Sequence, residues 1–422
     1  MNIKNKLEKG VIMAKRSRRD FVRNVLLGGA AAAGSRICSG LSGIAGSGKI
    51  FIPASAASVA GTSVSCSAPR EHSMYSISKK DGKGLSPGIE AMYYEKLGDQ
   101  RVRCELCHRG CVIADGNRGF CRNRENRGGT LFSMVFGRPS AVEVDPVEKE
   151  PQHHMLPGTE MLSIGTAGCN FRCRHCHNWH LSQRSIEEIG RYYDHPPQVA
   201  VQRALDLGVR SISSTYNEPT VFYEYVLETA KLARGKGLRI IWHSNGYMKP
   251  DPLKELLQHT DSVTIDLKGF SQSAYGNSSA ELKPVLETLE IIRKSGVWLE
   301  IVNLVIPTVN DSMREIGELS RWIRDTLSPE VPLHFSRFFP SYRLTHIPAT
   351  PVETLDRAWQ TARKTGIHYV TIGNVPGHRN NSTFCPKCGG MLLHRVHFQL
   401  IENNIADGKC AACGHAIPGI WV

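Results

Sequence analysis

The sequence predicts an α/β protein with a partial (β/α) barrel of the TIM type, an N-terminal four-cysteine segment before it and a small C-terminal four-cysteine ribbon after it. Two observations lead to this prediction. From residue 161 onward, apolar runs of strand type alternate with amphipathic helical patterns, which is typical of parallel α/β proteins. The chain also has 13 cysteines, and all but two of them fall into three clusters.

The expected strands and helices follow one another in regular order. Strand-like runs cover residues 161–167, 209–216, 238–246, 262–269, 298–307, 332–340 and 368–375. Helical patterns between them cover residues 198–207, 221–233, 282–294, 313–326 and 352–364. Repeated βα units of this kind close into a barrel or part of one, and they carry their chemistry at the carboxyl ends of the strands.

The first 60 residues resemble an export leader. The run SRRDFVR at residues 17–23 precedes a short Ala/Gly-rich apolar stretch at 25–34, which resembles a twin-arginine signal. This stretch is too short to cross a bilayer as an ordinary helix, so we expect no integral membrane span in the mature chain. Use of the signal predicts a periplasmic protein; a basic tail that only resembles a signal predicts a cytoplasmic one. Residues 61–92 are expected to form a disordered linker.

The formal net charge of +13 suggests an acidic partner such as nucleic acid, but the distribution of the charge argues against one. Residues 1–36 hold nine Lys or Arg against Glu8 and Asp20, so this segment carries +7 and the rest of the chain +6. The body is only mildly basic, and we expect no nucleic-acid partner.

Cys169, Cys173 and Cys176 form a C-x3-C-x2-C run directly after the first strand-like segment. Three thiolates are one short of the four that close a structural zinc site or a fully protein-bound iron–sulfur cluster. A cluster held by three cysteines leaves one iron open to a small molecule. The alternative is a structural zinc held by two of these cysteines and a nearby histidine, which could be His175, His177 or His180.

Polar side chains follow the predicted strands at the end where a barrel carries its chemistry. Taken singly, each could be a cap or a turn residue. Together they predict a site at the mouth of the barrel. Besides the cysteine triplet they are Asn217, Glu218, Ser244, Asn245, Asp266, Lys268, Asn303 and His334.

These motifs resemble the radical S-adenosylmethionine (SAM) superfamily, and the triplet followed by His177-Asn178 is similar to its glycyl-radical activating branch, typified by pyruvate formate-lyase activating enzyme. The resemblance implies a 4Fe-4S cluster on Cys169, Cys173 and Cys176, with SAM on the remaining iron. It also implies that an electron from a flavodoxin- or ferredoxin-like donor cleaves SAM to methionine and a 5′-deoxyadenosyl radical, which abstracts hydrogen from a substrate.

The resemblance also assigns SAM contacts. Residues 216–219, Tyr-Asn-Glu-Pro, stand where the family has Gly-Gly-Glu-Pro, so Glu218 is expected at the SAM amino group and Asn217 among the SAM contacts. The close backbone approach is expected to change where Tyr and Asn replace glycine. Asp266 and Lys268 match the pair that contacts the ribose and carboxylate of SAM. Asn245, Asn303 and His334 are positional matches, and His175 stands where an aromatic residue often lies near the adenine.

Residues 93–422 are similar to a narrower family, the radical SAM member of the AmmeMemoRadiSam system. The similarity includes CELCHRGCVIADGNRGFC at 104–121 and DPVEKEPQHHMLPGT at 145–159. It implies a radical SAM enzyme whose hydrogen donor is a protein glycine or an organic molecule, and it leaves the substrate open. The alternatives are an exported iron–sulfur electron carrier without SAM chemistry and a zinc-ribbon nucleic-acid-binding protein.

Two further cysteine sets predict metal sites. Cys385-x2-Cys388 and Cys410-x2-Cys413 predict a ribbon that binds structural zinc, with iron as the alternative. The N-terminal set fits a zinc knuckle and a second, electron-relaying iron–sulfur cluster equally well; it consists of Cys104, Cys107, Cys111 and Cys121. The expected domains are a leader (1–60), a linker (61–92), a Cys-rich segment (93–160), the barrel (161–378) and the ribbon (379–422).

Overall fold

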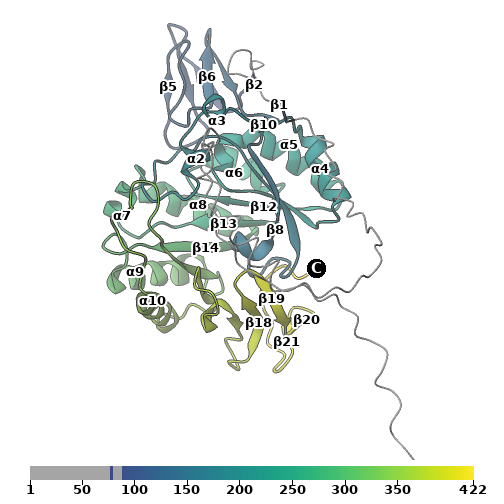
Figure 1. The fold of residues 1–422 in the computed structure, drawn as a ribbon, viewed down its shortest axis with the longest axis vertical. Helices are drawn as coiled ribbons and strands as arrows, with labels where there is room; N and C mark the ends of the chain where they lie inside the picture. The colour runs from purple at the N-terminus through teal and green to yellow at the C-terminus, as the bar shows by residue number, and fades with distance from the viewer. Residues whose placement is uncertain (1–76, 79–87) are drawn as a thin grey trace, which may run out of the picture. The chain divides into compact units, whose positions relative to one another are not determined.

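A sheet of eight strands forms the centre of the computed structural model, which describes residues 77–78 and 88–422 (Figure 1). The strands lie in the order β16-β15-β14-β13-β12-β11-β9-β8, and all except β8 run parallel. They are β8 (Ala141–Pro146), β9 (Glu160–Gly165), β11 (Ser211–Ser214), β12 (Arg239–Ser244), β13 (Ser262–Asp266), β14 (Trp298–Val305), β15 (Leu333–Arg337) and β16 (Val370–Gly373). Since β16 and β8 are the two edges, the sheet stays open, and the predicted α/β class with a partial barrel is confirmed.

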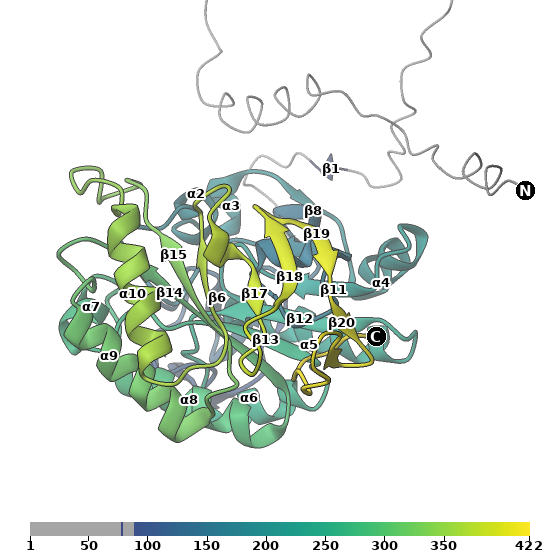
Figure 2. The same cartoon turned by 90° about the horizontal axis from the view of Figure 1, so that it is seen from below.

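Helices join the parallel strands and cover the outer face of the sheet (Figure 2). The longer ones are α4 (Pro197–Asp206), α5 (Tyr223–Arg234), α6 (Pro250–Leu257), α8 (Leu282–Ser295), α9 (Met313–Trp322) and α10 (Val352–Lys364). The short ones are α2 (Trp179–Ser182), α3 (Ile186–Ile189), α7 (Gln272–Gly276), η1 (Val147–Lys149), η2 (Pro219–Phe222), η3 (Ile323–Leu327) and η4 (Arg379–Asn381). The five predicted helices are present. The sequence patterns missed α6, which begins with Pro250 in its first turn, where a missing N–H costs no hydrogen bond.

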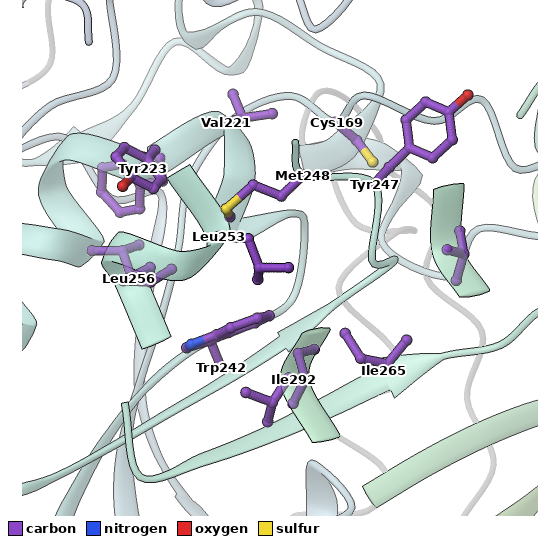
Figure 3. Packing of buried hydrophobic residues seen from close by; sticks show 14 of the residues in the cluster. Cys169, Val221, Tyr223, Trp242, Tyr247, Met248, Leu253, Leu256, Ile265 and Ile292 are labelled. Atoms are coloured by element: carbon purple, nitrogen blue, oxygen red, sulfur yellow. The ribbon is translucent and has the colours of Figure 1, made fainter. Parts of the chain in front are cut away.

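Apolar side chains from the strands and from the inner faces of the helices form the main core. Figure 3 shows Trp242 of β12 and Ile265 of β13 packed with Leu253 and Leu256 of α6, and all four side chains are buried. Each such side chain contributes about 1.5–3 kcal/mol by leaving water. Cys169 lies at the edge of this cluster, beside Tyr247, so the loop that carries the cysteine triplet rests directly on the core.

The N-terminal segment consists of two small antiparallel sheets, β2-β7-β6 and β3-β4-β5. Their strands are β2 (Ile89–Glu90), β3 (Tyr94–Lys96), β4 (Val102–Cys104), β5 (Val112–Ile113), β6 (Arg124–Arg127) and β7 (Thr130–Ser133). An ion pair fixes them to the barrel: Arg124 of β6 and Glu224 of α5 lie 2.7 Å apart, and both side chains are 2% exposed.

The C-terminal module carries a three-stranded sheet, β17 (Thr383–Phe384), β18 (Met391–Val396) and β19 (Gln399–Asn403), and a two-stranded one, β20 (Ile405–Ala406) and β21 (Lys409–Cys410). After it the chain returns to the barrel, where Ile420 pairs with Met155 in an isolated β-bridge. The described residues belong to one compact unit, so the module is an integral part of the barrel structure.

The predicted export leader, residues 1–60, lies outside the described residues, as does most of the predicted linker. The described part of residues 61–92 departs from the expected disorder. It contains β2 and β1 (Ile77–Ser78), which pairs with β10 (Tyr192–Tyr193), because these residues complete sheets whose other strands come later in the chain. Within the described residues, no helix combines the length and the apolar character needed to cross a membrane.

Glu224→Ala should lower the free energy of unfolding by about 3–5 kcal/mol, because it leaves the buried Arg124 guanidinium without its counter-charge. Denaturant unfolding of the purified protein measures the change. The matched control is Glu95→Ala, which removes one partner of the exposed Arg103–Glu95 pair and should cost about 1 kcal/mol or less. Equal losses in the two variants would contradict the anchoring role of the buried pair.

Candidate functional site

A cavity of ≈ 460 Å³ lies on the face of the sheet turned away from the helices. Its walls come from the loops that follow β9, β11, β12 and β13, from the segment between β8 and β9, and from the β18–β19 turn. The structure therefore brings together residues that are far apart in the sequence. The predicted site residues that line the cavity are Cys169, Cys173, Cys176, Asn217, Glu218, Asn245, Asp266, Lys268 and His334.

The cysteine triplet occupies the loop after β9. Cys169 and Cys173 are buried and Cys176 is partly exposed. The Cys169 sulfur accepts hydrogen bonds from the main-chain N–H of Phe171 (3.3 Å) and from the side-chain amide of Asn245 (3.7 Å). Burial raises the pKa of Cys169 and raises that of Cys176 to about 11. Since a metal binds the thiolate, metal binding must displace these protons.

The sulfur positions argue against the alternative of a zinc ion at the triplet. Among the described residues, three or more possible metal ligands lie within 4.8 Å of one another only at the C-terminal cysteines. A single tetrahedral ion needs its ligands that close, whereas a cluster of several irons holds its cysteines farther apart. The triplet with His175, His177 or His180 does not form a single-ion site in this arrangement.

Asn217 and Tyr216 shape the loop after β11. Asn217 accepts a hydrogen bond from the N–H of Thr166 (3.0 Å) and donates one to the carbonyl of Gly168 (2.8 Å), so it joins this loop to the start of the cysteine loop. Tyr216, which replaces a glycine of the related motif, has a φ of 69°, in the left-handed region that glycine favours. Tyr216 therefore adopts a left-handed conformation here without the conformational freedom of glycine.

Glu218 is 1% exposed, and protein donors surround its carboxylate. It accepts hydrogen bonds from the Thr220 hydroxyl (2.6 Å), the Ser244 hydroxyl (2.7 Å) and the N–H of Asn245 (2.9 Å). Burial raises its pKa, although these donors oppose the rise. The carboxylate therefore fixes the Ser244–Asn245 turn, and through Asn245 it supports the Cys169 sulfur.

Asp266 and Lys268 form an ion pair at the end of β13, with 3.0 Å between Oδ2 and Nζ. His243 of β12 approaches the other oxygen of Asp266 at 3.2 Å. Burial works against the charged form of Asp266, but Lys268 and His243 outweigh it and hold the pKa of this carboxyl well below its usual range. The pair stays ionised at neutral pH and presents one negative and one positive group to the cavity.

His175 is buried and lines the same cavity between the second and third cysteines. Burial lowers its pKa to about 3, so the imidazole is neutral at physiological pH. Its Nδ1 atom has no hydrogen-bond partner among the described residues. A buried polar atom of this kind is expected to meet a ligand atom, which fits a site that binds a polar small molecule.

Comparisons with known proteins agree with this geometry. The radical SAM superfamily profile matches residues 163–319. The uncharacterized protein MJ0808 of Methanocaldococcus jannaschii is 43% identical over 330 residues, which cover 78% of this chain and 98% of the relative. The chain belongs to the radical SAM superfamily. The narrower AmmeMemoRadiSam assignment stays a prediction.

Two further comparisons cover parts of this radical SAM chain. The pyruvate formate-lyase-activating enzyme of Clostridium pasteurianum is 24% identical over 170 residues, 39% of this chain and 69% of that enzyme. Among solved structures, Streptococcus suis SuiB bound to S-adenosylmethionine aligns with a TM-score of 0.42 and 13% identity, over 54% of this chain and 53% of that one.

The floor of the radical SAM cavity is the segment between β8 and β9, to which sequence reasoning assigned no role. Glu150 and His153 of this segment are buried and line the cavity. Ser213 of β11 donates its hydroxyl to both oxygens of Glu150 (2.6 and 2.7 Å). One feature of the sequence could have indicated this role. The run DPVEKEPQHHMLPGT at 145–159 is dense in charged residues and histidines, which are candidates for a functional site.

His334 and Asn303 depart from the expected strand-end positions. His334 is the second residue of β15, and its ring nitrogens contact Thr371 and Glu300 at 2.7 Å each, so it belongs to the floor rather than to the mouth. Asn303 does not line the cavity; its amide donates to the carbonyl of Leu267 (2.7 Å). Its neighbours Val302 and Leu304 line the cavity instead, because side chains alternate along β14.

The C-terminal cysteines are arranged for one metal ion. Cys385 and Cys413 lie 3.7 Å apart between sulfurs, and Cys388 and Cys410 lie 3.8 Å apart. Four thiolates around a tetrahedral zinc, with Zn–S bonds of about 2.3 Å, stand about 3.8 Å from one another. The set fits a tetrahedral zinc or iron ion. The N-terminal cysteines line a second, smaller cavity.

Glu150→Gln should change the pH dependence of stability, because burial raises the pKa of this carboxyl to about 7. Below the pKa that Glu150 has in the unfolded chain, the carboxyl is protonated in both states and does not affect stability. As the pH rises from there to 7, the unfolded chain ionises first, and the free energy of unfolding falls. Glutamine never charges, so the variant should gain about 3 kcal/mol in unfolding free energy relative to wild type between pH 5 and pH 8. Denaturant unfolding at the two pH values measures the gain.

The control is Glu143→Gln, on an exposed residue of β8. A pH-dependent gain of the same size in this variant, or none in Glu150→Gln, would refute burial as the cause.

Proposed function

We propose that the chain is a radical SAM enzyme that holds a 4Fe-4S cluster on Cys169, Cys173 and Cys176 and cleaves SAM reductively beside it. When bound, the cluster and SAM supply a 5′-deoxyadenosyl radical for hydrogen abstraction. One observation carries the proposal: Cys169, Cys173 and Cys176, the only cysteines of the described residues that line this cavity, share it with an ion pair and with a histidine whose Nδ1 atom has no partner among those residues.

The residues around the cysteines have distinct roles in this proposal. Lys268 attracts the SAM carboxylate and Asp266 accepts from the ribose, since charged hydrogen bonds of this type are the strong ones. Glu218, which protein donors already surround, acts mainly by positioning Asn245 and the Cys169 sulfur. Asn217 positions the cysteine loop, His175 lies against SAM, and His334 shapes the floor. Asn303 has no part in SAM binding.

The substrate would occupy the part of the cavity that Glu150 and His153 of the floor segment line. Relatives named as activating enzymes for glycyl-radical enzymes favour a protein substrate of that type, with an organic molecule as the alternative. A flavodoxin- or ferredoxin-like protein donates the electron. The C-terminal cysteines bind zinc and hold the β18–β19 turn against the cavity, which His397 and Phe398 of that turn line.

An electron carrier without SAM chemistry is the competing function. A carrier needs its cluster close to the surface and has no use for a cavity of ≈ 460 Å³ beside it. The Asp266–Lys268 pair also has no role in a carrier, so the cavity favours the enzyme.

The triple variant Cys169→Ala/Cys173→Ala/Cys176→Ala should lose the iron and sulfide of one cluster and all SAM cleavage. Chemical analysis after anaerobic purification measures the first loss, and 5′-deoxyadenosine formation after reduction measures the second. The control is Cys38→Ala/Cys66→Ala, which changes cysteines outside the three clusters and should alter neither quantity. Wild-type protein with a cluster spectrum indifferent to SAM would refute the proposal.

Lys268→Met should raise the Kd for SAM by about tenfold or more, because a hydrogen bond to a charged group is worth about 1.5–3 kcal/mol. Equilibrium dialysis with labelled SAM under anaerobic conditions measures the change. Lys283→Met is the control, since the Lys283 side chain is 87% exposed and lies outside the cavity. Unchanged SAM affinity in Lys268→Met would remove this residue from the site.

A further inference from the structure

The four cysteines of the N-terminal segment converge on one cavity. Cys104 is the last residue of β4, and Cys107, Cys111 and Cys121 follow it along the chain. All four are free thiols. All four line the cavity, and its other walls are mainly apolar. Those walls include Leu106, Ile113, Phe120 and Val221. Four free thiols that line one cavity are a candidate ligand set for a metal centre.

The spacing of the four sulfurs separates this site from the C-terminal one. The C-terminal sulfurs all lie within 4.8 Å of one another, and the N-terminal set does not meet this condition within the described part of the chain. A single zinc ion would draw its four thiolates that close. The N-terminal set therefore lacks the spacing of a single-ion site, and a centre of several metal atoms, whose cysteines stand farther apart, is the alternative.

Two arginines line the same cavity and oppose the negative charge of a thiolate-bound centre. Arg124, 2% exposed, lies in its wall and is paired with Glu224. The guanidinium of Arg109 lies 4.1 Å from the centre of the Phe120 ring and donates to the carbonyl of Asn170 (2.8 Å). Centres held by four thiolates carry net negative charge, which nearby cations stabilise.

The two cysteine sites share one wall. Asn170, the neighbour of Cys169, lines the N-terminal cavity, and its side-chain oxygen accepts a 2.7 Å hydrogen bond from Asn245 of the SAM cavity. Arg172 donates to the carbonyl of Cys169 (2.9 Å) and to that of Phe120. The N-terminal cavity therefore adjoins the cysteine loop of the first site, which is the placement that an electron relay requires.

We propose that Cys104, Cys107, Cys111 and Cys121 bind a second iron–sulfur cluster, which relays electrons to the cluster on Cys169, Cys173 and Cys176. The relay rests on the proposed function; the cluster itself does not. When bound, the second cluster would supply the first with one electron taken from a reduced ferredoxin- or flavodoxin-type protein. That electron would break the sulfur–C5′ bond of SAM to give methionine and the 5′-deoxyadenosyl radical, with no proton transfer. Cys107, Cys111 and Cys121 are partly exposed, so the electron can enter at this edge.

The first test uses the triple variant Cys169→Ala/Cys173→Ala/Cys176→Ala of the full chain, purified anaerobically. It should keep the iron and sulfide of one cluster, and after dithionite reduction it should give an EPR signal that SAM does not alter. Further substitution of Cys111 and Cys121 by Ala should abolish iron, sulfide and signal. Zinc without sulfide in the triple variant would overturn the proposal, and so would the absence of any metal. Neither result depends on whether wild type cleaves SAM.

The second test isolates the relay. Cys111→Ser/Cys121→Ser should lose SAM cleavage driven by reduced flavodoxin but keep cleavage driven by dithionite, because a small reductant reaches the first cluster directly. Retained dithionite-driven cleavage also shows that the variant is folded. Equal rates with flavodoxin in variant and wild type would refute the relay, and loss with both reductants would assign the segment a structural role instead. Cys38→Ser/Cys66→Ser is the matched control and should keep both rates.

Discussion

The buried carboxylate of Glu300 holds the interior of this open barrel together. It is fully buried, and it accepts hydrogen bonds from the N–H groups of His153 (2.9 Å) and His154 (2.8 Å), from Trp298 Nε1 (2.9 Å) and from His334 Nε2 (2.7 Å). Burial alone would raise its pKa, but these donors, His334 foremost, lower it to about 2. A buried charge without such partners costs several kcal/mol, so the β8–β9 segment stays inside the sheet because its N–H groups satisfy Glu300. The same segment carries the C-terminal module, since His154 contacts the carbonyl of Pro418 at 2.8 Å.

A close approach of two backbones joins the cysteine triplet to the N-terminal cysteines. Gly168 has a φ of 87°, and a Cβ atom at this position would collide with the carbonyl oxygen of Cys121 and with the side-chain amide of Asn123. Only glycine can adopt this left-handed conformation and leave room for the Cys121 carbonyl and the Asn123 side chain. The cysteine loop of the radical SAM site can therefore lie directly on the N-terminal segment, and the buried Arg124–Glu224 pair keeps that segment in place. Cysteine clusters nearly 50 positions apart in the sequence thus become neighbours.

Local patterns predicted the parts of the fold that depend on local physics. The seven predicted strands and the five predicted helices appear where the patterns put them, whereas β8 of the central sheet was missed. The two-plus-two spacing of the C-terminal cysteines predicted a ligand set that the structure brings together. The floor could not be predicted, because Glu150, His153 and Glu300 become a unit only when β8 pairs antiparallel with β9. Asn303 lies on the face of β14 away from the cavity, and the sequence did not reveal this because β14 has one polar residue on each face, Glu300 on one and Asn303 on the other. The position of Asp266 and Lys268 at the cavity could be predicted, because both residues lie at the carboxyl end of β13.

Tyr216 shows how the chain departs from its family motif without losing the site. Tyr216 has a φ of 69°, and a non-glycine residue in this left-handed region carries about 1–3 kcal/mol of backbone strain. The conformation persists because the surroundings fix it at both ends: the tyrosine hydroxyl donates to Asp145 at the end of β8, and Asn178 donates to the tyrosine carbonyl (2.6 Å). Asp145 also pairs with Lys149, which follows it on the floor segment (2.7 Å). Glycine would supply the same backbone angle and the same carbonyl acceptor, but not the hydroxyl that donates to Asp145. The substitution therefore adds a direct link between the loop that carries Glu218 and the segment that closes the cavity from below.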